Sequence, residues 1–356
     1  MDNSFLLQTQ FLHKQNFGDN NQGLLNGNIG IAIFLYHVSR VIQNSGTEEM
    51  ADNLLDKIFA SLATTAPSDF GNGLAGIGWG IEYLVQNGFA ECNTDEILDE
   101  VDTKVYKTLC DENLNSFELT NGLTGYLVYL NARLRNNCDP QAMACRINKE
   151  LLIHTINKLD EIVSSQFPSI IKEMYFDLFW RFPLMLYALT QSYQLDIYNQ
   201  KIEQMIKQWI LYFEAYIPSL HINRVFMALV LNHVNAIFPN KRIEKQVQVL
   251  LFATNFDEIA FEFDPHNDGI RYGWSGAVWV LYMAKKQLSP DSINYPLILK
   301  TYNEYLIRFK SKLDAIKTLN IDSSPTNNYG ISEGVSGIGL MELFWPDVFG
   351  VRDSFS

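Results

Sequence analysis

One short segment of the chain, residues 263–269, combines residue types that bind metals and transfer protons. It reads Phe-Asp-Pro-His-Asn-Asp-Gly and places Asp264, His266 and Asp268 at alternate positions. One imidazole and two carboxylates are able to ligate a metal or to supply a general base. Short segments rich in Asp, Asn and Gly also form plain turns in which the side chains cap the local backbone. We therefore treat His266 as a candidate catalytic residue and keep a plain turn as the alternative.

A Gly-x-x-Gly motif followed at once by an apolar stretch recurs five times along the chain. The motifs begin at Gly27, Gly73, Gly122, Gly273 and Gly334. The first three are separated by 46 and 49 residues, and the 151 residues between the third and the fourth leave room for two more units. Two degenerate copies fit that gap, with Arg181 and Asn223 at the position of the first glycine. The sequence therefore predicts seven units, and a repeat of this length decides the architecture before any single residue does.

Amphipathic stretches alternate with the apolar ones, and their apolar residues recur at intervals of three and four. They cover residues 48–64, 94–110, 141–164, 199–213 and 292–313. A helix that is apolar nearly all round must be buried, whereas a helix with one polar face lies at the surface. We therefore predict an all-α fold: a single (α/α) toroid domain over residues 1–356, with about seven inner and seven outer helices and Gly-x-x-Gly turns.

The glycines are expected to be mainly architectural. Glycine is able to adopt positive φ in a turn and to let helix ends pack closely. The same arrangement turns seven helix N-termini towards one end of the ring, where their free N–H groups and dipoles predict a binding face. The cavity that the glycines frame is then the functional part.

Three charged residues precede glycine motifs and would meet at the mouth of that cavity. Glu118, Arg271 and Glu333 each lie one to four residues before the first glycine of a motif. Arg271 is suited to clamp a substrate carboxylate or phosphate, or else it forms an ion pair with Glu333 that satisfies the local structure. Glu118 and Glu333 are candidates for paired carboxylates in acid–base catalysis.

Three aromatic residues stand at the starts of the predicted inner helices. Trp180, Tyr272 and Trp274 are candidates for the lining of a peptide groove. Aromatic side chains at such positions also serve as core, because they bury large areas. The sequence leaves both roles open.

Bulk properties narrow the class of partner. The 356 residues are 47% hydrophobic and 13% aromatic, which suits a large helical core, and the net charge is −13. Such a charge argues against nucleic acid or an anionic membrane as partner. It is compatible with a basic peptide, and a role in solubility alone would also explain it. There is no apolar run long enough for membrane insertion and no recognisable signal peptide. The four cysteines, without a Cys-x-x-Cys pair, predict reduced thiols in the cytoplasm.

The glycine motifs also carry a resemblance to a known family. Residues 73–79 (Gly-Leu-Ala-Gly-Ile-Gly-Trp), 122–130 and 334–340 resemble the repeats of lanthionine synthetase C-like (LanC-like) proteins. Five such motifs in step, over essentially the whole chain, are a strong signal where one would be weak. The resemblance implies an (α/α) toroid of seven inner and seven outer helices. It also implies cyclase chemistry, in which one zinc ion held by two cysteines and a histidine helps a peptide cysteine add to a dehydroalanine or dehydrobutyrine.

The positions that the resemblance assigns to zinc ligands and proton-transfer groups hold other residues in this chain. Arg271 stands at the first cysteine, and Ser332 and Glu333 stand at the second cysteine and the histidine. A guanidinium cannot ligate zinc and one carboxylate does not make a zinc site, so we expect no zinc cofactor. Glu118 occupies the position of the family's aspartate. Trp180 aligns with its histidine, in a segment that has lost both glycines.

These observations favour a zinc-free member of the family. The first hypothesis is a pseudoenzyme that binds a peptide substrate, a precursor peptide or a peptide-modifying enzyme. The second is a metal-independent peptide-modifying enzyme with Glu118, Glu333 and His266 as catalytic residues. The third is a carbohydrate-active (α/α) barrel, for which six helix pairs are expected rather than seven. The candidates for substrate binding are Arg271, Tyr272, Trp180, Trp274 and Ser332.

Overall fold

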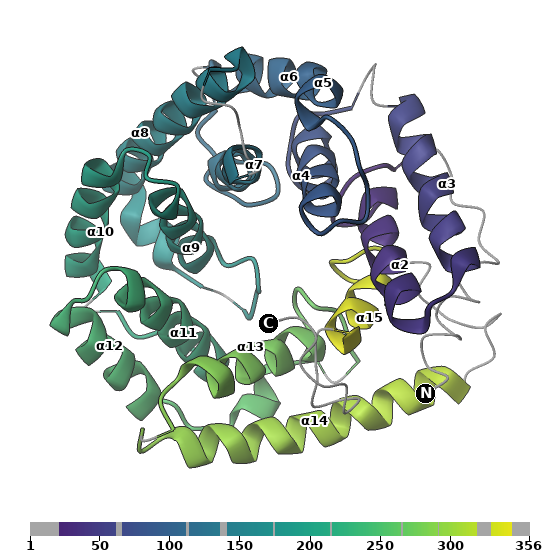
Figure 1. Cartoon of the computed structure of the whole chain (residues 1–356). Helices are drawn as coiled ribbons and strands as arrows, with labels where there is room; N and C mark the ends of the chain where they lie inside the picture. Colours follow the sequence, from purple (N-terminus) through teal and green to yellow (C-terminus); the bar gives the residue numbers. More distant parts are fainter. Residues whose placement is uncertain are drawn as a thin grey trace.

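The helices of the protein form two concentric rings, seen end-on in Figure 1. This computed structural model describes residues 21–61, 66–111, 114–135, 141–173, 175–213, 216–264, 266–290, 292–318 and 329–343. Within these ranges the regular elements are fourteen α-helices and one short 3-10 helix, with no strand. The predicted all-α toroid is confirmed, while the single domain over residues 1–356 stays a prediction.

Seven of the described helices form the inner ring. They are α2 (Asn28–Ile42), α4 (Leu74–Gln86), α7 (Leu123–Arg135), α9 (Arg181–Gln194), α11 (His221–Ile237), α13 (Trp274–Gln287) and α15 (Val335–Leu343). Each packs against the next, and α15 packs against α2, so the ring closes (Figure 1). The apolar sequences explain this position, since every residue of α2 from Asn28 to Ser39 is buried. Seven inner helices also favour the lanthionine-type toroid over a carbohydrate-active barrel with six helix pairs.

The outer ring surrounds these helices. It consists of α3 (Ser45–Ser61), the short α5 (Thr94–Ile97) with α6 (Asp99–Leu109), α8 (Met143–Ile171), α10 (Asn199–Phe213), α12 (Lys241–Phe252) and α14 (Tyr295–Thr318). Except for α5, each packs against the inner helix that precedes it. The five predicted amphipathic stretches coincide with outer helices, apart from residues 62–64, which lie outside the described residues. The predicted seventh outer helix is not among the described helices. None of the described helices is both long and apolar enough to cross a membrane.

Close packing, rather than positive φ, explains the glycine motifs. Gly73 and Gly273 are the N-caps of their helices with φ of −109° and −115°, a backbone conformation open to any residue. The expected positive φ is therefore wrong at these positions. The second glycine is the tighter one, because a Cβ on Gly76 would lie 2.0 Å from the carbonyl oxygen of Phe70. In the other four motifs the equivalent distance is between 1.9 and 2.2 Å, so only glycine fits where the chain folds back over the first helical turn.

This fold-back also supplies acceptors to the helix N-termini. The first N–H of the helix donates to a carbonyl seven residues earlier, from Leu74 to Pro67 at 2.8 Å and from Trp274 to Asn267 at 3.0 Å. The corresponding bonds at α2 and α7 measure 3.0 and 2.8 Å. Because these N–H groups are already satisfied, the prediction that free helix N-termini form a binding face is wrong for these four helices.

The degenerate repeats begin earlier than predicted, and α11 uses a different cap. The N-caps are Trp180 and Leu220, one and three residues before the predicted positions Arg181 and Asn223. The carboxylate of Glu262 accepts the first two N–H groups of α11, at 2.5 and 3.0 Å. An acidic side chain thus does for α11 what the backbone fold-back does in the glycine repeats. Glu262 belongs to the short 3-10 helix η1 (Ile259–Glu262).

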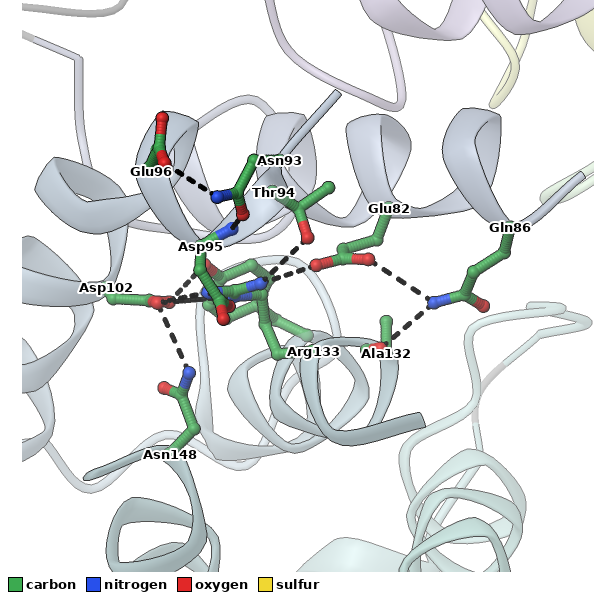
Figure 2. A network of polar contacts seen from close by, with 11 residues as sticks. Glu82, Gln86, Asn93, Thr94, Asp95, Glu96, Asp102, Ala132, Arg133 and Asn148 are labelled. Carbon is green, nitrogen blue, oxygen red and sulfur yellow. Dashed lines mark hydrogen bonds and ion pairs between the residues drawn. The ribbon is translucent and has the colours of Figure 1, made fainter. Parts of the chain in front are cut away.

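A buried polar network joins α4, α5, α6, α7 and α8 on one side of the ring (Figure 2). Arg133 of α7 is 2% exposed, and it donates to Glu82 at 2.6 Å and to Asp102 at 2.8 Å. The same guanidinium reaches Asp95 at 3.0 Å, and Asp102 also accepts from Asn148 at 3.2 Å. The five helices are therefore held together by one buried cation.

Backbone hydrogen bonds connect the loops that precede the inner helices. The N–H of Leu178 donates to the carbonyl of Arg271 at 2.8 Å, that of Arg271 to Ser332 at 3.1 Å, and that of Ser332 to Leu25 at 2.9 Å. The series continues into the loops before α4 and α7, with bonds of 2.9 and 2.7 Å. Four of these residues share one position, two residues before the N-cap position of an inner helix: Leu178, Arg271, Ser332 and Leu25. Segments distant in the sequence thus meet at one end of the ring, and these include the candidate site residues Arg271 and Ser332.

Candidate functional site

The side chain of Arg271 forms a bidentate ion pair with Asp177. Nε lies 3.0 Å from Oδ1 and Nη2 lies 3.0 Å from Oδ2. Burial would lower the pKa of Arg271, but the hydrogen bonds and the charge of Asp177 outweigh it and raise the pKa. Asp177 is itself fixed, since Oδ1 also accepts the N–H of Phe179 at 2.8 Å. The guanidinium is therefore permanently charged and held in one orientation.

Aromatic rings enclose this ion pair. The guanidinium carbon of Arg271 lies 4.5 Å from the ring centroid of Tyr272 and 4.9 Å from that of Phe179. Tyr272 in turn meets Tyr175 edge to face, with ring centroids 5.5 Å apart. Tyr175 is 57% exposed, so the aromatic group reaches solvent. Tyr272 lies beside Arg271, whereas its role in binding stays a prediction.

Glu333 lies near this pair but is not part of it. The alternative that Arg271 pairs with Glu333 is wrong, because the guanidinium is turned to Asp177. The Glu333 carboxyl packs against Gly269, where an added Cβ would lie 2.0 Å from Oε2. Its Oε1 is fully buried and has no hydrogen-bond partner among the described residues. Burial raises the pKa of Glu333, although the charge of Arg271 acts in the opposite direction.

The three positions that the resemblance assigns to zinc ligands lie together, but their side chains do not fit zinc. The backbone of Arg271 is bonded to that of Ser332, and Ser332 is followed directly by Glu333. Zinc requires thiolate, imidazole or carboxylate donors, usually three or four of them. Among the described residues no group of three His, Cys, Asp or Glu side chains is placed to hold a metal. Ser332, predicted to bind substrate, is 4% exposed, and the bonds seen for it are those of its backbone.

The described cysteines do not contribute to the site. Cys92, Cys110 and Cys145 are free thiols, and Cys138 lies outside the described residues. Burial, followed by the negative charge of Glu82, raises the pKa of Cys92. This environment disfavours the thiolate.

Glu118 is held by a second arginine. Its carboxylate lies 2.6 Å from Nε of Arg181, the first residue of α9, and both side chains are partly exposed. The guanidinium of Arg181 also lies 5.3 Å from the ring centroid of Phe117. The charged partner that the structure gives Glu118 is therefore a guanidinium and not a second carboxylate, and the catalytic pairing of Glu118 with Glu333 stays a prediction.

The segment around His266 has the hydrogen bonds of a turn. Asp264 accepts the N–H of His266 at 2.9 Å, and Asn267 accepts the N–H of Gly269 at 3.0 Å, each through its own side chain. His266 and Asp264 are both exposed. Among the described residues, these two side chains and Asp268 do not form a group placed to hold a metal ion. The geometry favours the turn, and the catalytic role of His266 stays a prediction.

The two predicted tryptophans are core residues. Trp180 is 5% exposed and its ring lies 6.4 Å from that of Phe226 on α11. Trp274 is 6% exposed and packs on Tyr305 of the outer helix α14, with ring centroids 5.0 Å apart. Trp274 therefore belongs to the packing between the rings, and of the three aromatic candidates only Tyr272 lies beside Arg271.

Asp177 is the residue of this site that the sequence analysis missed. It lies in the loop before α9, where the glycine motif has been lost and no pattern marks it. One signal was present. Leu178 lies two residues before the N-cap of α9, just as Arg271 lies two residues before Gly273, the N-cap of α13. The two loop positions are therefore equivalent, and Asp177, next to Leu178, comes to lie beside Arg271.

A closed toroid of helices with a site in its loops defines a class of protein. Comparisons with a family model and with solved structures indicate which class this is. The model of the family described as "Lanthionine synthetase C-like protein" matches residues 18–178. Among solved structures the chain is similar to nisin cyclase, with a TM-score of 0.68, 15% identity, and coverage of 98% of this chain and 94% of that chain. At this identity the likeness establishes the fold. No curated protein matches the chain. Residues 18–178 thus match the lanthionine synthetase C-like family, and the likeness in fold extends over nearly the whole chain.

Proposed function

We propose that this protein is a zinc-free member of its family that binds a peptide at the end of the ring where Arg271, Asp177, Tyr272 and Glu333 lie. The observation that carries the proposal is the bidentate pair between Arg271 and Asp177. An arginine has no lone pair to offer a metal, and this one is held charged by its partner.

A peptide is the ligand that the likeness supports best. The family is named for lanthionine synthetase, and the solved structure similar to this chain is called a cyclase of nisin. The site itself offers aromatic surface and charged groups side by side, the combination found at binding sites for peptides. Tyr175 and Tyr272 supply the aromatic part.

The metal content of the purified, untagged protein tests the zinc-free state. Elemental analysis of the wild type is expected to give no stoichiometric zinc. A variant with Arg271→Cys, Ser332→Cys and Glu333→His restores the donor set of the family and is expected to hold about one zinc per chain. That variant shows that the assay detects a site in this position. Near-stoichiometric zinc in the wild type would overturn the proposal.

Peptide binding is tested by selection from a random decapeptide library displayed on phage. Wild-type protein is expected to enrich peptides whose affinity falls about tenfold with Tyr272→Ala, which corresponds to about 1.4 kcal/mol for the loss of an anchoring aromatic side chain. Tyr106→Ala is the matched control, because Tyr106 is 49% exposed on the outer helix α6. Failure to enrich any peptide, or equal binding by wild type and Tyr272→Ala, would contradict a peptide site at this place.

The metal-independent enzyme is the second candidate, and one feature favours it. The buried, unpartnered oxygen of Glu333 and the raised pKa of its carboxyl are typical of groups that transfer protons. This function requires that Glu118→Gln or Glu333→Gln abolishes modification of a selected peptide without unfolding the protein. Full activity of both variants on that peptide would remove this candidate.

A further inference from the structure

The charges around Glu333 do not cancel. Arg271 and Asp177 neutralise one another through two hydrogen bonds of 3.0 Å. Glu333 lies close enough for both to affect its ionisation, yet no described residue pairs with its carboxylate. Removing a charge from water without a partner costs free energy, so ionised Glu333 is left with an uncompensated cost.

The geometry leaves one oxygen of Glu333 for a ligand. Oε1 is fully buried, whereas the residue as a whole is only partly buried and Oε2 lies beside Gly269. A side chain at position 269 would occupy the space of Oε2, because its Cβ would lie 2.0 Å from this atom. The glycine therefore gives the carboxylate its room.

Aromatic surface adjoins the same place. Burial chiefly, and to a smaller extent the charges of Asp177 and Glu333, raises the pKa of Tyr272. Its ring contacts that of Tyr175, whose side chain is more than half exposed. Aromatic faces attract cations, and they do so more strongly beside a carboxylate. A metal ion is not served by this arrangement, since it needs several donors and no group of three exists among the described residues.

We propose that Glu333 is the specificity-determining residue of the peptide site and takes a cationic group of the bound peptide, a lysine or arginine side chain, at Oε2. The inference rests on the proposed peptide-binding function and names the chemistry of its ligand. The net charge of −13 attracts the same class of ligand over longer distances. An acidic ligand is disfavoured here, because Arg271 is already neutralised and Glu333 would repel it.

Calorimetric titration of the full chain with three synthetic decapeptides tests this inference. The first contains lysines among serines and glycines and has both ends blocked. The second has glutamine in place of each lysine, also with blocked ends. The third is the glutamine peptide with a free N-terminal amine, and it separates recognition of a side chain from recognition of a terminus. The wild type is expected to bind the first peptide about tenfold more tightly than the other two.

Two variants identify the residue responsible. Glu333→Gln keeps the size of the side chain, and Gly269→Ala displaces the carboxylate without changing any charge. Both are expected to lower the affinity for the lysine peptide about tenfold and to leave that for the glutamine peptide unchanged. Glu100→Gln, at an exposed position of α6, makes the same charge change and is expected to have no effect.

The outcomes separate the two proposals. Equal binding of the lysine peptide by wild type and Glu333→Gln overturns the role of Glu333 and leaves peptide binding intact. Preference for the third peptide over the first assigns the cation to an N-terminus and overturns the lysine or arginine side chain. If none of the three peptides binds while the displayed library yields binders, the preference for a basic peptide is overturned and peptide binding itself stands. Absence of binders in both experiments overturns the proposed function as well.

Discussion

Arg271 and Asp177 lie 94 positions apart in the sequence and hold each other through two hydrogen bonds of 3.0 Å. The loops that carry them are joined directly, since the N–H of Leu178 donates to the carbonyl of Arg271. The pair is partly buried, with side chains 22% and 16% exposed. It therefore serves both the stability of the ring and the orientation of the candidate site.

Breaking this pair is expected to destabilise the fold measurably. Asp177→Ala leaves a half-buried guanidinium without its partner and removes the cap on Phe179, at a cost of about 2 kcal/mol in the free energy of unfolding. Urea denaturation measures the change. Glu203→Ala is the control, because Glu203 pairs with Lys207 on the exposed face of α10 and is expected to contribute less than about 0.5 kcal/mol. Equal costs for both variants would contradict the part assigned to Asp177.

The second glycine of each motif is expected to tolerate no side chain. In Gly76→Ala the new Cβ meets the backbone oxygen of Phe70, which cannot move without shifting the loop before α4. We expect a loss of at least about 3 kcal/mol, or failure to fold. Gly46→Ala, in the first turn of α3, meets a single side-chain oxygen at 3.2 Å and is expected to be neutral or up to about 1 kcal/mol more stable. Chemical denaturation of both variants decides, and a Gly76→Ala protein as stable as the wild type would refute the packing role.

The glycine repeat made the fold predictable from sequence. The loss of the glycines in two of the repeats limited what could be predicted of the site. Glycines at five of the seven inner helices fixed the start of each helix, because only glycine fits under the fold-back. Where the glycines are lost the predicted starts were displaced, and the cap of α11 is a glutamate 41 residues later in the chain. No local pattern reports such a partner.

The same limit applies to the charged residues. The sequence singled out Arg271 and Glu333 and offered their ion pair, but the choice between Glu333 and Asp177 depends on which loops lie side by side. Asp177 stands in the loop without a motif, so its place next to Arg271 follows only from the backbone bonds between loops. The prediction of free helix N-termini failed for a related reason, since the acceptors are carbonyl groups, which the sequence does not distinguish.

The buried Arg133 network is expected to be the most sensitive electrostatic element of the described part of the chain. Arg133→Met leaves the carboxylates of Glu82 and Asp102 buried without their cation, and we expect a loss of about 4 kcal/mol. Arg135→Met is the matched control on the same helix, because Arg135 is exposed, and it is expected to cost less than about 1 kcal/mol. Thermal and urea unfolding measure both. If the two variants unfold alike, the network adds nothing specific to the ring.

His37 is expected to make the protein less stable as the pH falls below neutrality. It is 4% exposed in α2, and its Nε2 lies 2.7 Å from the hydroxyl of Tyr83. Burial, with a smaller contribution from the charge of Arg40, lowers the pKa of His37 from 6.5 to about 4. Between these two values the unfolded chain binds a proton at this residue that the folded chain does not. The free energy of unfolding therefore decreases as the pH is lowered from about 6.5 to about 4.

The loss from His37 approaches about 3 kcal/mol once the pH is below its folded pKa. His37→Phe removes this titration, so the difference in stability between about pH 7 and about pH 4.5 is expected to be smaller in the variant than in the wild type. His266→Gln is the control, since it removes a histidine from an exposed position. Urea denaturation at both pH values measures the slopes. Parallel slopes for wild type and His37→Phe would mean that His37 is protonated in the folded protein as readily as in the unfolded chain.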